Sequence, residues 1–173
     1  MKEVTLETER LILRPLTIED AEDVFEWTSD ERVTKYMSYP RHESIETTKW
    51  WLSSLKELPD DDFQFGFVLK ETGRLIGSGG IKYDDKEKAW TFGYNIRFDC
   101  RNKGYTTELT KRMIEFANKE HGARDFFACH AVDNPASGRV MEKCGLEFSH
   151  YGEFSKFDGS ETFKAKFYKM HLD

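Results

Sequence analysis

The sequence has 173 residues, of which 38% are hydrophobic, so it is long enough for one domain, residues 1–173, with a substantial core. Its formal net charge of -6 at pH 7 argues against non-specific binding to nucleic acid and against docking on anionic lipid, because both need a basic face. Cys100, Cys129 and Cys144 are widely spaced without a Cys-x-x-Cys pair, which predicts reduced thiols and no zinc site. With no long uncharged apolar segment, we expect a cytoplasmic chain without a metal.

The N-terminal third reads as strand, helix, loop and helix. Residues 10–15 form a short apolar run closed by Pro15, and residues 17–29 carry a helical pattern with acidic residues in the first turn, where the helix dipole favours them. Residues 30–43 have mixed polarity and no sustained period, so we predict a long loop, which in a compact domain suggests a binding function. Ser44 can cap the next helix, which ends near Pro59.

The middle of the chain changes to strand patterns. Residues 63–70 and 75–83 flank a turn that contains Gly73, which predicts a hairpin. Residues 89–98 alternate as a long strand, and this strand leads into a cationic turn that contains glycine. We therefore expect a hairpin and then a third, long strand before the turn.

The turn Arg101–Glu108 is the stretch around which we organise the chain. A helix is predicted from about Thr106, because apolar residues recur downstream at helical spacing. The first backbone N–H groups of a helix have no intrahelical partner and carry the positive end of the dipole, so they suit a phosphate group, and Gly104 lets a ligand approach the main chain. A turn of this kind is also compatible with simple helix entry on an unrelated α/β domain.

The C-terminal part begins with a buried strand over residues 124–132. Asn134 at the cap position and Pro135 at the first helical position predict a helix that Gly145 ends. Residues 146–154 and 162–170 read as a closing hairpin. Its free edge could pair with a second chain, and Lys164, Lys166 and Lys169 could equally protect that edge, so we expect a monomer or a weak homodimer.

Three segments together resemble the GNAT superfamily of N-acetyltransferases, and specifically its ribosomal-protein N-terminal acetyltransferase branch. Residues 8–15 look like the opening strand of that branch, Arg101-x-x-Gly104-x-Thr106-Thr107-Glu108 looks like its acetyl-CoA motif, and Asn134-x-x-Ser137 followed by residues 142–146 looks like its second signature. The order and spacing of these segments cover nearly the whole chain.

The resemblance implies an α/β (α+β) GNAT fold, with a mixed and mostly antiparallel splayed sheet of about seven strands and about four flanking helices. The pantetheine arm of acetyl-CoA would lie in the splay, where the backbone of Ile96, Arg97 and Phe98 would pair with its amides like an added strand. Arg101 or Lys103 would add positive charge to the pyrophosphate site, and Asn134 and Ser137 would face the thiol end. The N–H groups expected to hold the pyrophosphate are those of Asn102, Lys103, Gly104, Tyr105, Thr106 and Thr107.

The implied reaction is direct attack of an amine on the thioester. Many superfamily members have a tyrosine where this chain has Met141 and an acid where it has Thr91, so the resemblance suggests Ser137 as the hydrogen-bond donor to sulfur. For the general base, Glu153 and His130 are candidates, and each is also compatible with a structural role.

The acceptor follows from the cost of obtaining a neutral amine. An α-amino group, with a pKa of about 7.7–8.0, costs roughly 1 kcal/mol to deprotonate at pH 7, whereas a lysine near 10.4 costs roughly 4–5 kcal/mol. A site without an evident strong base therefore favours the α-amino group of a peptide or protein N-terminus. A small amine, such as a polyamine or aminoglycoside, and a non-catalytic acyl-CoA sensor are the alternatives.

Overall fold

The protein is described by a computed structural model that covers residues 3–173. Its strands are β1 (Leu6–Glu7), β2 (Leu11–Arg14), β3 (Asp62–Leu69), β4 (Leu75–Asp84), β5 (Ala89–Ile96), β6 (Asp125–Ala131), β7 (Glu147–Ser155) and β8 (Thr162–His171). Its α-helices are α1 (Ala21–Thr28), α2 (Glu31–Thr34), α3 (Ile45–Ser54), α4 (Tyr105–His121) and α5 (Pro135–Lys143). Three short 3-10 helices are η1 (Ile18–Asp20), η2 (Leu55–Glu57) and η3 (Phe98–Cys100).

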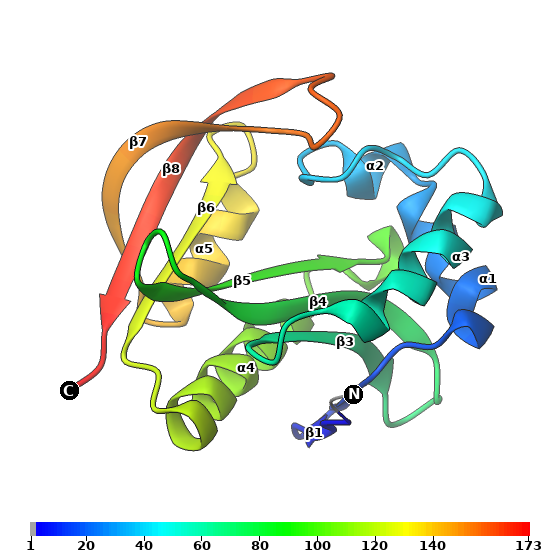
Figure 1. The fold of residues 1–173 in the computed structure, drawn as a ribbon, viewed down its shortest axis with the longest axis horizontal. Coiled ribbons are helices and arrows are strands. Elements are labelled where there is room, and N and C mark those ends of the chain that lie inside the picture. The colour runs from blue at the N-terminus through cyan, green and yellow to red at the C-terminus, as the bar shows by residue number, and fades with distance from the viewer. Residues whose placement is uncertain (1–2) are drawn as a thin grey trace.

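The strands form one sheet in the order β1-β2-β3-β4-β5-β6-β8-β7 (Figure 1). Neighbours are antiparallel except β5 and β6, which run parallel. These two strands pair only where Trp90 lies opposite Phe126 and Thr91 opposite Phe127. Beyond Thr91, β5 continues along β4 and β6 continues along β8, and the two strands part. The predicted splayed, mostly antiparallel sheet is therefore confirmed.

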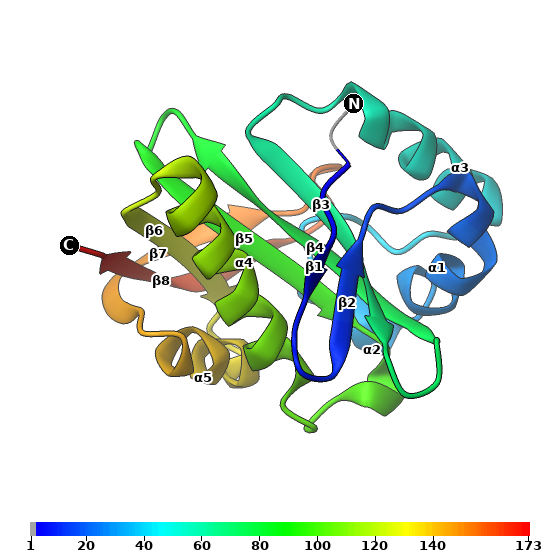
Figure 2. The same ribbon diagram turned by 90° about the horizontal axis from the view of Figure 1, so that it is seen from below.

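Two apolar clusters hold the helices against the sheet. In the larger cluster, α4 contributes Leu109 and Met113, both fully buried, and packs against the strands β2 to β6. The smaller cluster joins α1 and α3 to the other face through residues such as Val24, Leu52 and Val68. Figure 2 shows α4 and α5 on the opposite side of the molecule from α1 and α3. The two clusters therefore lie on opposite faces of the sheet, and the larger one contains residues from both sides of the splay, such as Phe92 of β5 and Phe126 of β6.

The predicted stripe on α4 explains how this helix is held. Leu109, Met113, Phe116 and Ala117 are buried, and Tyr105 is partly buried at the first position of the helix. The spacing of these residues places them on one face of an α-helix, which the larger cluster covers. The helix ends at His121, and the C-cap residue Gly122 has a φ of 66°. The sequence predicts this end, because a glycine commonly stops a helix in the left-handed conformation.

The structure departs from the sequence-based expectations in two places. The described chain has eight strands and five α-helices, instead of about seven and four, because β1 and α2 are too short for a periodic pattern to reveal. The predicted loop over residues 30–43 begins with α2, and Asp30 caps that helix by accepting a hydrogen bond from the Arg32 N–H at 2.9 Å. The cap of α3 by Ser44 is confirmed, since Ser44 accepts from the Glu46 N–H.

The closing hairpin also corrects the view of the sheet edge. β7 is the outermost strand, whereas β8 lies between β6 and β7. Lys164, Lys166 and Lys169 therefore stand on an interior strand and do not protect the free edge. Among residues 3–173, no helix is long and apolar enough to cross a membrane.

Candidate active site

The turn before α4 has the backbone geometry of an anion site. Gly104 has a φ of 82° and Asn102 a φ of 62°, both in the left-handed region. The consecutive N–H groups of residues 102–107 have no acceptor in the described chain, and the helix ladder starts only where the Glu108 N–H donates to the Gly104 carbonyl at 3.2 Å. These donors stand at the positive end of a 17-residue helix. The turn can therefore hold a phosphate group.

A carboxylate at the start of α4 joins this turn to the opening strands. Glu108 accepts hydrogen bonds from the Thr8 hydroxyl at 2.5 Å, the Arg10 N–H at 3.0 Å and the Arg10 Nε at 2.8 Å. Arg10 also donates to the Lys103 carbonyl at 2.9 Å, and its guanidinium lies 4.4 Å from the centre of the Tyr105 ring. Two motifs that the sequence shows separately, residues 8–15 and 101–108, are thus one structural unit.

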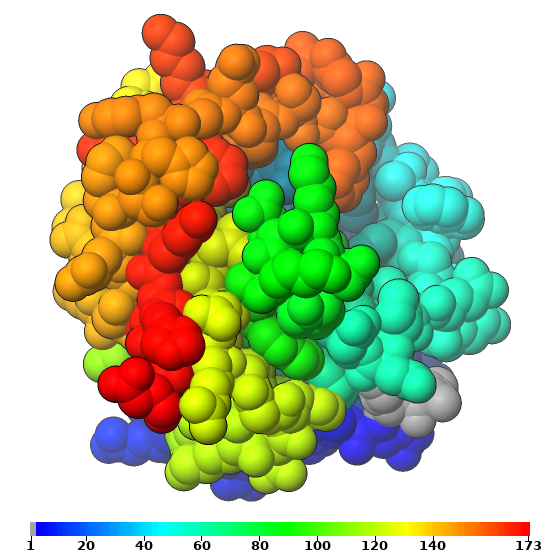
Figure 3. Space-filling model, turned by 60° about the vertical axis from the view of Figure 1, so that its left-hand side comes forward, coloured from blue at the N-terminus to red at the C-terminus, as the bar shows by residue number. Residues whose placement is uncertain are grey.

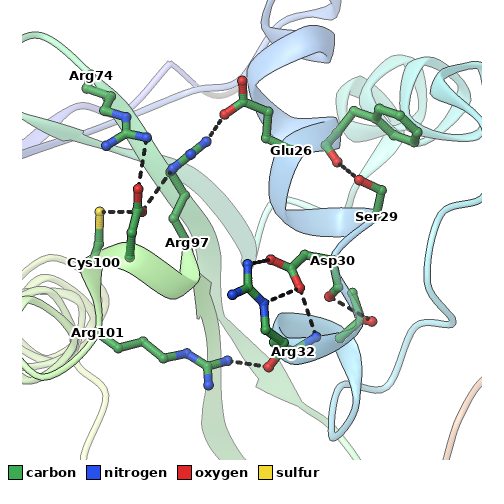
Figure 4. Close-up of polar contacts among 11 residues, drawn as sticks. Glu26, Ser29, Asp30, Arg32, Arg74, Arg97, Cys100 and Arg101 are labelled. Carbon is green, nitrogen blue, oxygen red and sulfur yellow. Dashed lines mark hydrogen bonds and ion pairs between the residues drawn. The ribbon is translucent and has the colours of Figure 1, made fainter.

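Arg101 connects the turn to α2. Figure 4 shows its side chain reaching toward Arg32, whose carbonyl accepts a hydrogen bond from the guanidinium at 2.7 Å. The Arg32 and Arg101 guanidiniums lie 4.1 and 5.1 Å from the centre of the Phe98 ring. Burial lowers the pKa of Arg101 from its usual value. Lys103, in contrast, is exposed and has no ion-pair partner within residues 3–173, so its charge is free to face an anion.

The backbone at the end of β5 presents hydrogen-bonding groups to the splay. The Arg97 N–H donates to the Ile76 carbonyl at 2.7 Å, so it points toward β4. Because backbone groups alternate in direction along a strand, those of Tyr94 and Ile96 point the other way, into the gap beside β6. The Arg97 side chain is ion-paired with Glu26 and with Asp99 (Figure 4). Residues 96–98 are the stretch whose backbone is expected to pair with the pantetheine amides. Of these, the main-chain groups of Ile96 face the gap, whereas the N–H group of Arg97 points toward β4.

A pair of hydroxyl groups bridges the splay. Tyr94 projects from β5 and Ser137 from α5, and the two hydroxyl oxygens lie 2.8 Å apart. Burial raises the pKa of Tyr94 well above its usual value, so the phenol keeps its proton. The sequence analysis missed Tyr94. The alternation of Phe92, Tyr94 and Ile96 on one side of β5 could have identified it, since a tyrosine directed into a core needs a partner for its hydroxyl.

The remaining predicted cofactor residues lie around this pair and the turn. Asn134 occupies the N-cap position of α5, but its side chain makes no capping hydrogen bond, so the amide is not committed to the helix. Thr106 and Thr107 belong to the first turn of α4 and are partly buried. The Thr107 carbonyl lies 3.9 Å from the Cys144 thiol at the end of α5, which places the two helix ends next to each other.

Neither candidate base is hydrogen-bonded to the hydroxyl pair in the described chain. His130 is 5% exposed, with Nδ1 2.7 Å from the Ala131 carbonyl and Nε2 3.5 Å from the Tyr168 hydroxyl. Gly138 allows α5 to lie against this ring, since a Cβ there would stand 2.6 Å from Nε2. This packing gives His130 a structural role, and its assignment as general base stays a prediction.

Glu153 lies on the exposed strand β7, opposite Lys164 in the ladder. Neighbouring side chains of a strand point to opposite faces, so Glu153 points away from the face that carries Phe154. The Phe154 ring packs against Phe163, and Phe163 packs in turn against Tyr36 of the loop after α2. Glu153 is therefore directed away from this aromatic group.

The two positions where the resemblance expects other residues are also explained. Met141 is 2% exposed and packs in the larger apolar cluster, so it brings no polar group to the site. Thr91 stands in the last pair of the β5–β6 ladder, at the point where the strands part. Within residues 3–173, no three His, Cys, Asp or Glu side chains are grouped so that they could hold a metal ion.

Residues 10–147 match the family model described as the acetyltransferase (GNAT) domain. The chain belongs to the GNAT acetyltransferase family. It is similar to the uncharacterized N-acetyltransferase YoaA of Bacillus subtilis, with 30% identity over 82% of each chain. It is also 26% identical to the FsC-acetyl coenzyme A-N(2)-transacetylase of Aspergillus fumigatus, over 89% of this chain and 69% of that protein.

Solved structures support the same fold for this GNAT enzyme. A GNAT acetyltransferase from Bacillus anthracis superposes with a TM-score of 0.85 at 25% identity, covering 97% of this chain and 98% of the other. A ribosomal-protein-S5-alanine acetyltransferase from Vibrio fischeri superposes with a TM-score of 0.80 at 18% identity, covering 98% and 97%. The protein is an N-acetyltransferase, and GNAT acetyltransferases use acetyl-CoA as the acetyl donor.

Replacing Glu108 should destabilise the junction between the opening strands and α4. Burial alone would raise the pKa of Glu108, but its hydrogen bonds to Thr8 and Arg10 hold it below the usual value. Its contribution to stability is therefore present above about pH 4.3 and is lost as the pH falls through the lowered pKa. We expect Glu108→Gln to lower the free energy of unfolding by about 1–3 kcal/mol at pH 7, with the difference shrinking in acid.

Denaturant unfolding at pH 7 and pH 3.5 measures this effect. Glu115→Gln on the same helix is the control, because Glu115 forms an exposed ion pair with Lys119 and should change stability by less than about 1 kcal/mol. Equal losses for the two variants would contradict the role assigned to Glu108.

Replacing Gly104 should remove acetyl-CoA binding. A Cβ at this position would stand 3.3 Å from Arg10 Nη2, and Gly104→Asp would add a negative charge beside the free N–H groups. Wild type should be stabilised by about 2.7 kcal/mol at a hundredfold excess of acetyl-CoA over its dissociation constant, whereas the variant should show little response. Thermal unfolding with and without acetyl-CoA measures both.

Gly73→Asp provides a matched control. Gly73 has a φ of 73° in the turn between β3 and β4, so it carries the same backbone penalty with nothing within 4 Å of its Cβ position. This variant should lose stability but keep the acetyl-CoA response. If Gly104→Asp also keeps the response, the turn is not the pyrophosphate site.

Proposed function

We propose that this acetyltransferase acetylates the α-amino group of a peptide or protein N-terminus with acetyl-CoA. The observation that carries the proposal is the hydroxyl pair Tyr94–Ser137, which spans the splay and, in the part of the chain that the structure describes, has no carboxylate or imidazole hydrogen-bonded to either hydroxyl. Such a site can stabilise a leaving thiolate but offers no strong base. It therefore suits an amine that is partly neutral near pH 7.

Acetyl-CoA would bind across the splay from the turn to α5. The free N–H groups of residues 102–107 would hold the pyrophosphate, with Lys103 adding charge. The backbone groups of Tyr94 and Ile96 that face the gap would pair with the pantetheine amides as an added strand. Asn134 and Ser137 at the start of α5 would then lie at the thioester end.

The chemical step consists of one bond formed and one broken. The amine nitrogen attacks the acetyl carbon, the C–S bond breaks, its electron pair passes to sulfur and the proton of the attacking nitrogen leaves to water. Ser137 would donate a hydrogen bond to the departing sulfur, and Tyr94, which remains protonated, would donate to the Ser137 oxygen and direct its proton toward sulfur. A thiol has a pKa near 8.5, so this donor pair needs only to assist the thiolate.

The acceptor would approach from the face of β5 that lies opposite α4. That face has an opening at Gly93, which is exposed and has no atom within 4 Å of its Cβ position. The next residue on the same face is Asn95, which accepts a hydrogen bond from the Tyr39 hydroxyl at 2.5 Å. Figure 3 shows a hollow between the hairpin β7–β8 and the β4–β5 turn, with atoms of the N-terminal part of the chain at its floor.

A small amine is the second candidate acceptor. The Aspergillus fumigatus relative is named as an acetyl coenzyme A-dependent N(2)-transacetylase of FsC, which shows that one relative acts on a nitrogen of that compound. A sensor without turnover is less well supported, because the hydroxyl pair replaces the group that Met141 lacks. Measuring the release of CoA with a panel of peptides and small amines separates these alternatives. Release with a small amine but not with a peptide favours the second acceptor, and no release with any amine favours the sensor.

The wider setting of the reaction follows the same proposal. We propose a single GNAT domain over residues 1–173 that works in the cytoplasm, where the free thiols Cys100, Cys129 and Cys144 would stay reduced. The enzyme would act as a monomer or a weak dimer, and its exposed edge strand β7 is the part able to pair with another chain.

Removing the hydroxyl groups should slow turnover without weakening acetyl-CoA binding. A hydrogen bond to a charged group contributes about 1.5–3 kcal/mol, so Ser137→Ala should lower kcat roughly 10- to 150-fold. Tyr94→Phe should lower it less, about 2- to 10-fold, because its bond is to a neutral oxygen. Steady-state kinetics with a peptide acceptor and calorimetric acetyl-CoA titration measure both effects. Unchanged kcat in both variants would remove the hydroxyl pair from the mechanism.

A peptide N-terminus should outcompete a lysine side chain. At pH 7 the neutral form of a lysine side chain costs roughly 3–4 kcal/mol more to obtain than that of an α-amino group. This difference corresponds to more than about a hundredfold in rate. A peptide with a free N-terminus and an acetylated lysine is compared with the same peptide blocked at the N-terminus and free at lysine. Faster acetylation of the lysine form would reject the α-amino assignment.

A further inference from the structure

A buried lysine in the hairpin β7–β8 binds the loop that follows α2. Lys156 is 7% exposed, although it follows β7 near the tip of an exposed hairpin. Its Nζ donates hydrogen bonds to the carbonyls of Thr34 at 2.9 Å, Met37 at 2.9 Å and Tyr39 at 3.3 Å. An ammonium group has three donors, and here all three are used.

These carbonyls belong to the end of α2 and the residues directly after it. The last carbonyls of a helix have no intrahelical donor, and a cation is favoured at that end of the dipole. Lys156 forms no ion pair with a carboxylate in the described chain; its three hydrogen bonds go to backbone oxygens, and the centre of the Phe163 ring lies 5.8 Å from Nζ. A buried charge is tolerated only when it is bonded in this way, which makes the contact sensitive to the exact position of the loop.

Two further contacts hold the hairpin to the same loop. The Phe157 N–H donates to the Ser38 carbonyl at 2.8 Å. The rings of Tyr36 and Phe163 meet edge to face with centroids 5.6 Å apart. Figure 1 shows the tip of the hairpin extending across the sheet to the loop beside α2. The hairpin and the loop, far apart in the sequence, thus close over the end of the splay.

The loop is anchored at its other end to β5 and to the helices α1 and α3. Tyr39 donates to Asn95 on β5, next to Tyr94 of the hydroxyl pair. The His42 N–H donates to the Thr28 carbonyl at 2.8 Å, and its ring nitrogen Nδ1 lies 2.8 Å from the Thr48 hydroxyl. With both ends fixed, the Lys156 hydrogen bonds are the largest set of contacts between the hairpin and the segment in between, and the Phe157 and Phe163 contacts lie beside them.

We propose that Lys156 is a positioning residue for the amine acceptor, holding residues 34–39 in the conformation that shapes the acceptor side of the splay. This inference rests on the proposed acetyl transfer, because the loop faces the side from which the acceptor would approach. Lys156 does not touch the reacting atoms and acts through the loop. Acetyl-CoA, held by the turn before α4 on other elements, is not expected to depend on it.

The test replaces Lys156 by methionine, which keeps the apolar stem and removes the three donors. Hydrogen exchange of the backbone amides in residues 34–42 should become about tenfold faster or more, while the core strands β3 and β4 stay protected. The KM for a peptide acceptor should rise about tenfold, with the dissociation constant of acetyl-CoA within about twofold of wild type.

The control is Lys169→Met, an exposed lysine on β8, which should behave as wild type. If Lys156→Met does not fold, Lys156→Gln, which retains a donor, should show the same pattern more weakly. Exchange in residues 34–42 that matches the control overturns the proposal, as does an equal loss of affinity for both substrates. If wild type acetylates no amine, the proposed function fails, whereas the exchange measurement still decides whether Lys156 holds the loop.

Discussion

The parting of β5 and β6 is the constraint on which the site depends. Their ladder contains two residue pairs, so each strand relies on its other neighbour, β4 for β5 and β8 for β6. The gap leaves the main-chain groups of Tyr94 and Ile96 without a strand partner, and such groups must be satisfied by water or a ligand. The same divergence opens the space that the Tyr94 and Ser137 hydroxyls span. A cofactor with amides along its length can complete the sheet there.

The helix α4 supplies the proposed phosphate end of the cofactor site beside this gap. Its buried face fixes it against the sheet, and the hydrogen bonds from Thr8 and Arg10 to Glu108 fix its first turn against the opening strands. Because both its buried face and its first turn are fixed, the N-terminus of α4 presents its free N–H groups without a reorganisation cost on binding. The proposed recognition of the pyrophosphate would therefore depend on packing as much as on the motif itself.

The short helix α2 stands between the two halves of the site. At one end Arg101 of the cofactor turn donates to the Arg32 carbonyl, and at the other Lys156 of the hairpin donates to the Thr34 carbonyl. A four-residue helix has too few internal hydrogen bonds to hold itself, so its position depends on the burial of Val33 in the smaller apolar cluster and on these cationic contacts. The cofactor turn and the acceptor side thus share one small element.

The sequence alone determined the order of the longer elements, the apolar face of α4, the glycine turn before that helix and the family, because these depend on local spacing and backbone preference. It could not reveal which groups Tyr94, Glu108 and Lys156 meet, because each partner is distant in the chain: Tyr94 lies 43 positions from Ser137, Glu108 lies 98 from Arg10 and Lys156 lies 122 from Thr34. His130 and Glu153 were plausible bases by residue type, and only the fold showed one packed under α5 and the other on the outer strand. Residue type and spacing decide what a segment can do, whereas the tertiary structure decides which groups it meets.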